Sequence, residues 1–209
     1  LQLRIAALRP DLDAKYRMTE QALRLARLLA GGVHRSLDTG REICHGVWPD
    51  PEGFWAGEPR QPHWGSVALL AGTAALRREP DLFLSRQLRD YYEFLERRTD
   101  ALNASELCYA LLGAACAAKA TEDGFYTGLT ATFAAALLKR LDPETGNLPA
   151  EHCEAPVGAH LVDLIYTANW ALLGLQAAAE TTGDGATVDA YRKLLALIVS
   201  IQDKSDHPA

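Results

Sequence analysis

Long uncharged runs are missing from this chain. The longest, residues 124–138 and 164–179, fall short of the ~20 apolar residues that a membrane-spanning helix needs. A cationic leader with an apolar core is missing too, but the chain starts at Leu1 and stops after Ala209 in what reads as a loop. We therefore expect residues 1–209 to be one domain that is truncated at both ends, with no membrane partner.

An excess of basic residues is also missing. The 209 residues carry a net charge of −6, whereas a general nucleic-acid binder needs a basic face. Glycine-rich phosphate loops of the P-loop or GxGxxG kind are absent, so we expect no nucleic-acid partner and no cofactor. The sequence says nothing about the oligomeric state.

Cysteine is scarce, with four residues. Cys108 and Cys116 lie eight residues apart on one predicted helix, ~12 Å along its axis, and cannot bridge each other. Cys44 and Cys153 fall in long loops and are the plausible intrachain pair. The alternative, four free thiols in a reducing compartment, is favoured, and with it a cytoplasmic location.

Two-residue alternation of apolar side chains is absent, and helical periodicity is present throughout, so the predicted fold is all-α. Gly31-Gly32 is expected to end the first helix, Pro80 to open the third, and Asn103 with Glu106 to form a capping box. The expected helices are residues 12–29, 63–78, 80–98, 104–120, 125–141, 159–181 and 187–202.

The connections between these seven helices run long, short, medium, short, long, short. Neighbouring antiparallel helices place every second connection on the same face, so one face carries most of the irregular chain and is the expected functional face. The second, fourth and sixth helices are apolar all round and should be inner, while the first and third have a charged face and should be outer. The fifth is uncharged, so either its exposed side is a Thr-Gly-Ala face or something else covers it.

Two layers of antiparallel hairpins are the layout of an α/α toroid. Three stretches are similar to those of the six-hairpin glycosidase-like superfamily of (α/α)6 toroids: Gly53-Phe54-Trp55 leading to His63-Trp64-Gly65, the turn at residues 142–148, and Thr182-Gly183-Asp184 followed by Tyr191. The chain holds about three and a half hairpins, where that superfamily has six. The resemblance implies an enzyme acting on sugars, including uronic acids.

The long loops lead into the N-termini of the inner helices, whose free N–H groups and positive dipole ends suit an anionic or hydroxylated ligand. Aromatic and polar side chains gather there that would bind an oligosaccharide or a uronic-acid-containing substrate. The expected substrate-binding residues are Trp55, His63, Trp64, His152, His160, Tyr166 and Asn169. Asn169 either forms hydrogen bonds within the core or points into the funnel, the space enclosed by the long loops at the starts of the inner helices.

A glycosidase needs two carboxyl groups that flank the scissile bond. The candidates are Glu151, Glu154 and Asp163 in and after the second long loop, and Asp50 in the first. Asp163 lies early on an otherwise apolar helix, where its alternative role is to stabilise the helix dipole or the core. The spacing of His152, Cys153, Glu154 and His160 matches no zinc pattern, so we expect no metal.

Two other functions remain open. One is a non-catalytic helical-repeat scaffold that binds a protein partner, and its acids would point to open solvent. The other is a terpenoid cyclase or prenyltransferase toroid, which would need a deep apolar pocket lined by aromatics from the inner helices. A glycosidase would bring a second-loop acid within ~10 Å of a first-loop acid.

Overall fold

A computed structural model describes residues 1–38, 63–149 and 164–201, and every regular element in these ranges is helical, which confirms the all-α prediction. The elements are α1 (Gln2–Leu8), α2 (Pro10–Tyr16), α3 (Met18–Asp38), α4 (His63–Leu76), α5 (Leu82–Glu96), the 3₁₀ turn η1 (Thr99–Ala101), α6 (Ala104–Thr121), α7 (Gly124–Leu138), α8 (Leu164–Thr182) and α9 (Gly185–Ser200).

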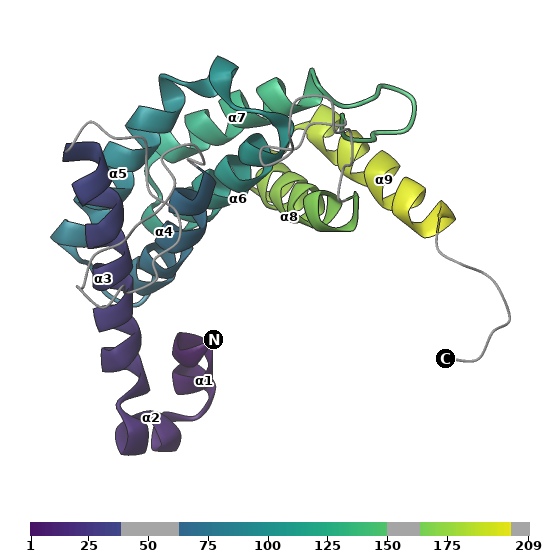
Figure 1. Cartoon of the computed structure of the whole chain (residues 1–209). Helices are drawn as coiled ribbons and strands as arrows, with labels where there is room; N and C mark the ends of the chain where they lie inside the picture. Colours follow the sequence, from purple (N-terminus) through teal and green to yellow (C-terminus); the bar gives the residue numbers. More distant parts are fainter. Residues whose placement is uncertain (39–62, 150–163, 202–209) are drawn as a thin grey trace, which may run out of the picture.

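The helices form a curved row that runs from α3 at one end to α9 at the other (Figure 1). Helix α6 packs against α4 and α8, while α3, α7 and α9 pack against α4, α6 and α8 respectively. Short turns join α4 to α5, α6 to α7 and α8 to α9, as predicted. The molecule therefore consists of helical hairpins set side by side, with α4, α6 and α8 as the inner helices.

Helix α6 is the centre of the core. Apart from its last turn and two partly exposed positions, Leu112 and Cys116, all of its side chains are buried, as its uniformly apolar sequence predicts. Alanine and glycine make this possible, because small side chains let neighbouring helices approach closely. A Cβ at Gly174 of α8 would lie 3.0 Å from the backbone oxygen of Cys108.

Two tyrosines of α5 fill the space that glycines leave open. The ring of Tyr91 lies where a Cβ on Gly65 of α4 would be, and the hydroxyl of Tyr92 lies where a Cβ on Gly113 of α6 would be. Tyr91 and Tyr92 are both buried and pack edge to face at 5.1 Å between ring centroids. Burial raises the pKa of both phenols, so they stay neutral inside the protein.

The α6–α7 and α8–α9 hairpins have turns with the same sequence pattern. The sequence Thr-x-Asp-Gly ends α6 and again ends α8, and Ala-Leu-Leu-Gly stands eight residues before each Thr, at 110–113 and 171–174. Asp123 accepts a hydrogen bond from the N–H of Phe125, and Asp184 accepts one from the N–H of Thr187, so each caps an outer helix. The two hairpins are therefore repeats whose residues can be matched position by position.

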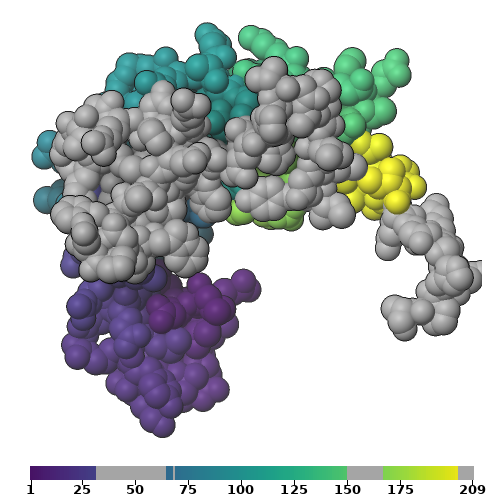
Figure 2. All heavy atoms as spheres, viewed as in Figure 1, coloured from purple at the N-terminus to yellow at the C-terminus, as the bar shows by residue number. Residues whose placement is uncertain are grey.

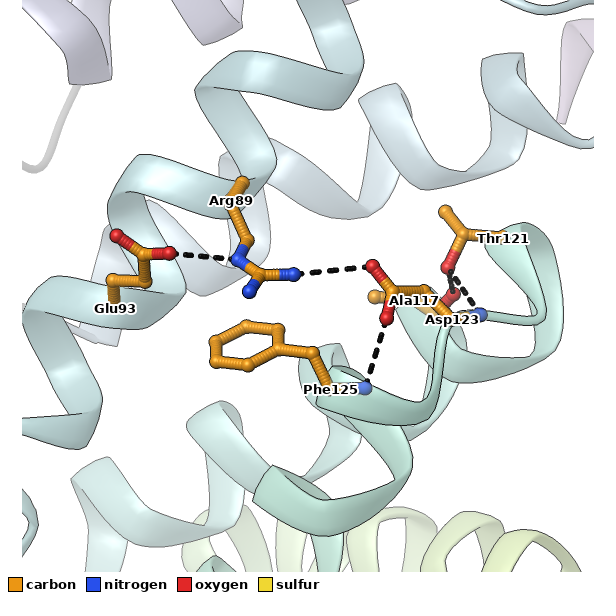
Figure 3. A network of polar contacts seen from close by, with 6 residues as sticks. All are labelled: Arg89, Glu93, Ala117, Thr121, Asp123 and Phe125. Carbon is orange, nitrogen blue, oxygen red and sulfur yellow. Dashed lines mark hydrogen bonds and ion pairs between the residues drawn. The ribbon is translucent and has the colours of Figure 1, made fainter.

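Figure 3 shows how α5 is fixed to the first of these turns. Arg89 Nε donates to a carboxylate oxygen of Glu93 at 2.7 Å, and Arg89 Nη1 lies 3.1 Å from Asp123 Oδ2. The guanidinium also stacks over the Phe125 ring, 3.7 Å from its centroid. One arginine thus joins α5 to both the cap and the first turn of α7.

The N-terminal region departs from the predicted single helix at residues 12–29. Arg17 adopts a left-handed conformation with φ 51°, which separates α2 from α3, and Asp13 accepts hydrogen bonds from the N–H and hydroxyl of Thr19. Helix α1 was not predicted. Figure 2 shows α1, α2 and the start of α3 as a lobe that projects from the rest of the molecule.

Other predicted boundaries also need correction. Helix α3 continues through Gly31-Gly32 to Asp38, and α5 begins at Leu82 with Asp81 as its N-cap, so Pro80 does not open it. Helix α8 exposes one face, although its sequence predicts burial all round. Helix α7 exposes Thr, Gly and Ala residues, as one of the two predicted alternatives requires: Thr127, Gly128, Ala131, Thr132 and Ala135.

Candidate functional site at the start of the inner helices

Helices α6 and α8 run parallel. Near their starts, the Ser105 and Thr167 hydroxyl oxygens lie 3.5 Å apart, and near their ends Lys119 pairs with Glu180. Their N-termini therefore lie at the same end of the molecule. The positive ends of the two helix dipoles point the same way there, which favours negative charge or a hydrogen-bond acceptor.

The start of α6 is a complete capping box, as the sequence predicts. Asn103 Oδ1 accepts from the N–H of Glu106 at 2.9 Å, and the Glu106 carboxylate accepts from the N–H of Asn103 at 2.8 Å. Capping accounts for the presence of Glu106 at this buried position. We therefore give this carboxylate a structural role.

An aromatic pair lies one turn further along the two helices. The rings of Tyr109 and Trp170 lie 4.6 Å apart between centroids at an interplanar angle of 39°. Tyr109 is 4 % exposed, Trp170 is partly exposed, and the neighbouring Asn169 is exposed. Ser105, Thr167 and Tyr109 are buried, so the part of this group that a ligand can reach is the Trp170 ring and the Asn169 amide. A partly exposed aromatic ring next in sequence to an amide suits a small hydroxylated ligand.

The structure places few of the predicted site residues. Asn169 is exposed, so the predicted structural role in the core is wrong. The other predicted role, contact with the substrate, stays a prediction. The backbones of His63, Trp64 and Tyr166 lie in the first turns of α4 and α8. Substrate-binding residues were predicted at these helix N-termini. The remaining predicted residues lie outside the described ranges: Asp50, Trp55, Glu151, His152, Glu154, His160 and Asp163, together with Cys44 and Cys153.

Tyr109 and Ser105 were not among the predicted site residues. The signal for Tyr109 in the sequence is the internal repeat, because Tyr109 and Trp170 occupy matched positions one residue before Ala-Leu-Leu-Gly. Ser105 has no such signal. Matched positions on adjacent parallel helices lie at the same level, which is why these two rings meet.

Two hollows in the described part of the chain lie elsewhere. One, of about 600 Å³, lies between α2, α3 and the turn after α4, and is lined by charged side chains that include Arg17, Arg24 and Glu79. The other, of about 370 Å³, lies along residues 140–149. Neither contains a predicted site residue.

The turn beside the second hollow is closed by hydrogen bonds. Asp142 Oδ1 accepts from the N–H and hydroxyl of Thr145 and from the N–H of Glu144, which lowers the pKa of Asp142. Lys193 of α9 donates to the backbone oxygen of Pro143 at 2.7 Å. This turn, one of the three stretches behind the superfamily resemblance, thus fixes the chain after α7 to α9.

Within residues 1–38, 63–149 and 164–201, no group of three or more His, Cys, Asp or Glu side chains is placed to hold a metal ion. No helix in the same ranges is both long and apolar enough to cross a membrane. Comparison of the chain with models of known protein families, with curated proteins and with solved structures finds no match in any of the three.

Proposed function

We propose that this protein binds and hydrolyses an oligosaccharide at the N-terminal ends of its inner helices. The observation that carries the proposal is the Tyr109–Trp170 pair beside the exposed Asn169, at the end where α6 and α8 both begin. The apolar face of a sugar ring stacks on an aromatic ring, while its hydroxyls pair with amide and hydroxyl groups.

The proposed chemistry uses two carboxyl groups, one protonated as general acid and one ionised as nucleophile or base. Asp163 directly precedes the first residue of α8 in the sequence, so it belongs to the entry of the same helix that carries Asn169 and Trp170. Its proposed partners are Glu151, Glu154 and Asp50. A substrate that contains uronic acids fits the two positive helix ends.

Binding is tested by thermal shift against neutral and uronic-acid oligosaccharides, because a ligand of the native state raises the melting temperature by mass action. We expect a shift with one sugar class that is lost in Trp170→Ala and largely kept in Trp170→Phe, which retains a ring. The same shift in wild type and Trp170→Ala would refute the site.

Catalysis is tested separately with Asp163→Asn. If Asp163 is catalytic, activity on the sugar identified above is abolished while the melting temperature changes little. A large drop in melting temperature would instead assign Asp163 to the fold.

A helical-repeat scaffold that binds a protein partner is the second candidate. The matched α6–α7 and α8–α9 hairpins favour it, because tandem hairpins in a curved row provide extended binding surfaces in repeat proteins. A flat response across the sugar panel from a folded protein would support this candidate. The cyclase alternative, which needs a deep apolar pocket lined by aromatics from the inner helices, stays a prediction.

A further inference from the structure

The larger of the two hollows, of about 600 Å³, has walls from three elements. On the α2 side it is lined by Pro10, Asp13, Ala14 and the C-cap residue Arg17. On the α3 side it is lined by Thr19, Glu20, Leu23, Arg24 and Arg27. Most of these residues recur at intervals of three and four, so each helix turns one face to the hollow. Glu79, in the turn after α4, forms the third wall, and the volume suits a small molecule.

Polar contacts join the walls of this hollow. Asp13 accepts from the N–H and the hydroxyl of Thr19 at 2.7 and 2.8 Å, across the left-handed residue Arg17. Arg27 Nε donates to the Asp81 carboxylate at 2.7 Å, and the same carboxylate caps α5. These contacts set the positions of α2, α3 and the start of α5 around the hollow without any ligand.

Most of the charged side chains that line the hollow have a partner in the protein. Three cations and three anions line it: Arg17, Arg24, Arg27, Asp13, Glu20 and Glu79. Four of the six are engaged, in the contacts Arg17–Glu20, Arg27–Asp81 and Asp13–Thr19. Two opposite charges remain, Arg24 on α3 and Glu79 in the turn after α4. Neither side chain has an ion pair or a hydrogen bond within residues 1–38, 63–149 and 164–201.

Arg24 and Glu79 line the same hollow and do not pair with each other. A guanidinium group binds a carboxylate through two parallel N–H groups, and a carboxylate binds an ammonium group. A simple anion would meet the negative charge of Glu79, and a simple cation would meet the positive charge of Arg24. A molecule that carries both a carboxylate and an ammonium group pairs with both side chains. The apolar lining residues, Pro10, Ala14 and Leu23, suit its aliphatic part.

We propose that this hollow binds a small zwitterion, an amino acid or a short peptide, with its carboxylate on Arg24 and its ammonium group on Glu79. The site is separate from the proposed sugar site, because Glu79 follows the end of α4 whereas Trp170 lies near the start of α8. The projecting lobe of α1, α2 and the start of α3 supplies two of its walls (Figure 2).

Isothermal titration calorimetry of the full chain tests the proposal, with the common L-amino acids, dialanine and trialanine as probes. We expect at least one probe to bind, and the amino-acid and peptide arms distinguish the two lengths of ligand. The best binder is then compared with two analogues, the acid that lacks its amino group and the amine that lacks its carboxyl group. Each analogue loses one of the two charge pairs, so its dissociation constant should be about tenfold or more higher.

Arg24→Gln and Glu79→Gln should each raise the dissociation constant of the best binder about tenfold or more. Both side chains are exposed and unengaged in the described ranges, so the melting temperature and helix content should not change. The matched controls are Arg97→Gln and Glu96→Gln, which remove the same two kinds of charge at the exposed end of α5. Both controls should bind the probe as the wild type does.

Absence of binding by every probe would overturn the proposal, as would binding that is unchanged in Arg24→Gln and Glu79→Gln. An analogue that binds as tightly as the zwitterion would also overturn it, because one charge would then suffice. Trp170→Ala should bind the zwitterion as the wild type does. Loss of binding in Trp170→Ala would place the ligand at the sugar site instead, so the two sites stand or fall separately.

Discussion

The hydroxyl oxygen of Tyr91 on α5 lies 2.9 Å from that of Ser66 on α4, and both side chains are buried. This hydrogen bond spans two helices of one hairpin at the point where Gly65 makes room for the Tyr91 ring. Variants of the two residues can show how much this polar contact in an apolar core contributes to the free energy of unfolding.

Tyr91→Phe should lower the free energy of unfolding by about 1 kcal/mol, because it leaves the buried Ser66 hydroxyl without this partner. Ser66→Ala should cost a similar amount for the converse reason. The double variant should be less destabilised than the sum of the two, as judged by urea denaturation. Additive effects would mean that the two hydroxyls do not interact.

Gly113→Ala should be destabilising by about 1–3 kcal/mol, since the new methyl group overlaps the Tyr92 hydroxyl and forces repacking. The matched control is Gly128→Ala on α7, where nothing lies near the added methyl. That change should stabilise by about 0.5–1 kcal/mol through helix propensity. Thermal unfolding of the two variants should thus shift in opposite directions, and equal shifts would refute the assigned packing.

Asp123→Ala and Arg89→Ala together should be less destabilising than the sum of the two, because Asp123 pairs with Arg89 as well as capping α7. Asp184→Ala should be additive with Arg89→Ala, since Asp184 caps α9 through the N–H and hydroxyl of Thr187. Thermal unfolding of the single and double variants measures both sums. Additivity in both pairs would show that the Arg89–Asp123 contact contributes nothing measurable.

Acid should weaken the contact between α3 and α5. Burial alone would raise the pKa of Asp81, but hydrogen bonds from the Leu84 N–H and from Arg27 outweigh it and lower this pKa below its usual value. A carboxyl group whose folded pKa is depressed stabilises the protein above its unfolded pKa of ~3.9, and this contribution is lost as the pH falls through the folded value.

The check is chemical denaturation of wild type and Asp81→Asn from neutral pH downward. The variant should be less stable near neutrality and should lose less stability than wild type below pH ~4. Parallel profiles for the two proteins would show that Asp81 does not contribute to acid sensitivity.

Sequence reasoning succeeded where local signals and burial agree. Helix α6 was expected at 104–120 and is found at Ala104–Thr121, because its capping box fixes the start and its apolar sequence requires burial. The exposed Thr-Gly-Ala side of α7 was one of two alternatives. It could be inferred from the small size and modest polarity of its residues, which tolerate water without charge.

Local signals failed where tertiary contacts decide. Gly31-Gly32 predicts a helix end, yet α3 continues through it. A Cβ at Gly31 would lie 3.8 Å from the Phe83 ring of α5. Packing against α5 therefore outweighs the helix-breaking tendency of glycine. Pro80 reads as a helix start, but Asp81 accepts from the Leu84 N–H and caps α5 one position later. The left-handed Arg17 that separates α2 from α3 has no signal such as Gly or Asn.

The sequence predicted only the end of the molecule at which the candidate site lies, and not the side chains that meet there. Loop lengths indicated the starts of the inner helices, and the Tyr109–Trp170 pair does lie toward that end of α6 and α8. Pairing of side chains across helices depends on the register of α6 against α8, which periodicity within one helix does not contain. The repeat of Ala-Leu-Leu-Gly carries that register.

The repeated Thr-x-Asp-Gly turn also bears on how the chain folds. Each turn closes a hairpin from residues that are neighbours in sequence, so ordering one hairpin needs no distant segment to be in place first. Hairpins at the two ends of the row have one neighbour, while α6 contacts α4, α7 and α8. Opening should therefore begin at the ends, and the amide protons of α6 should be the last to exchange with solvent.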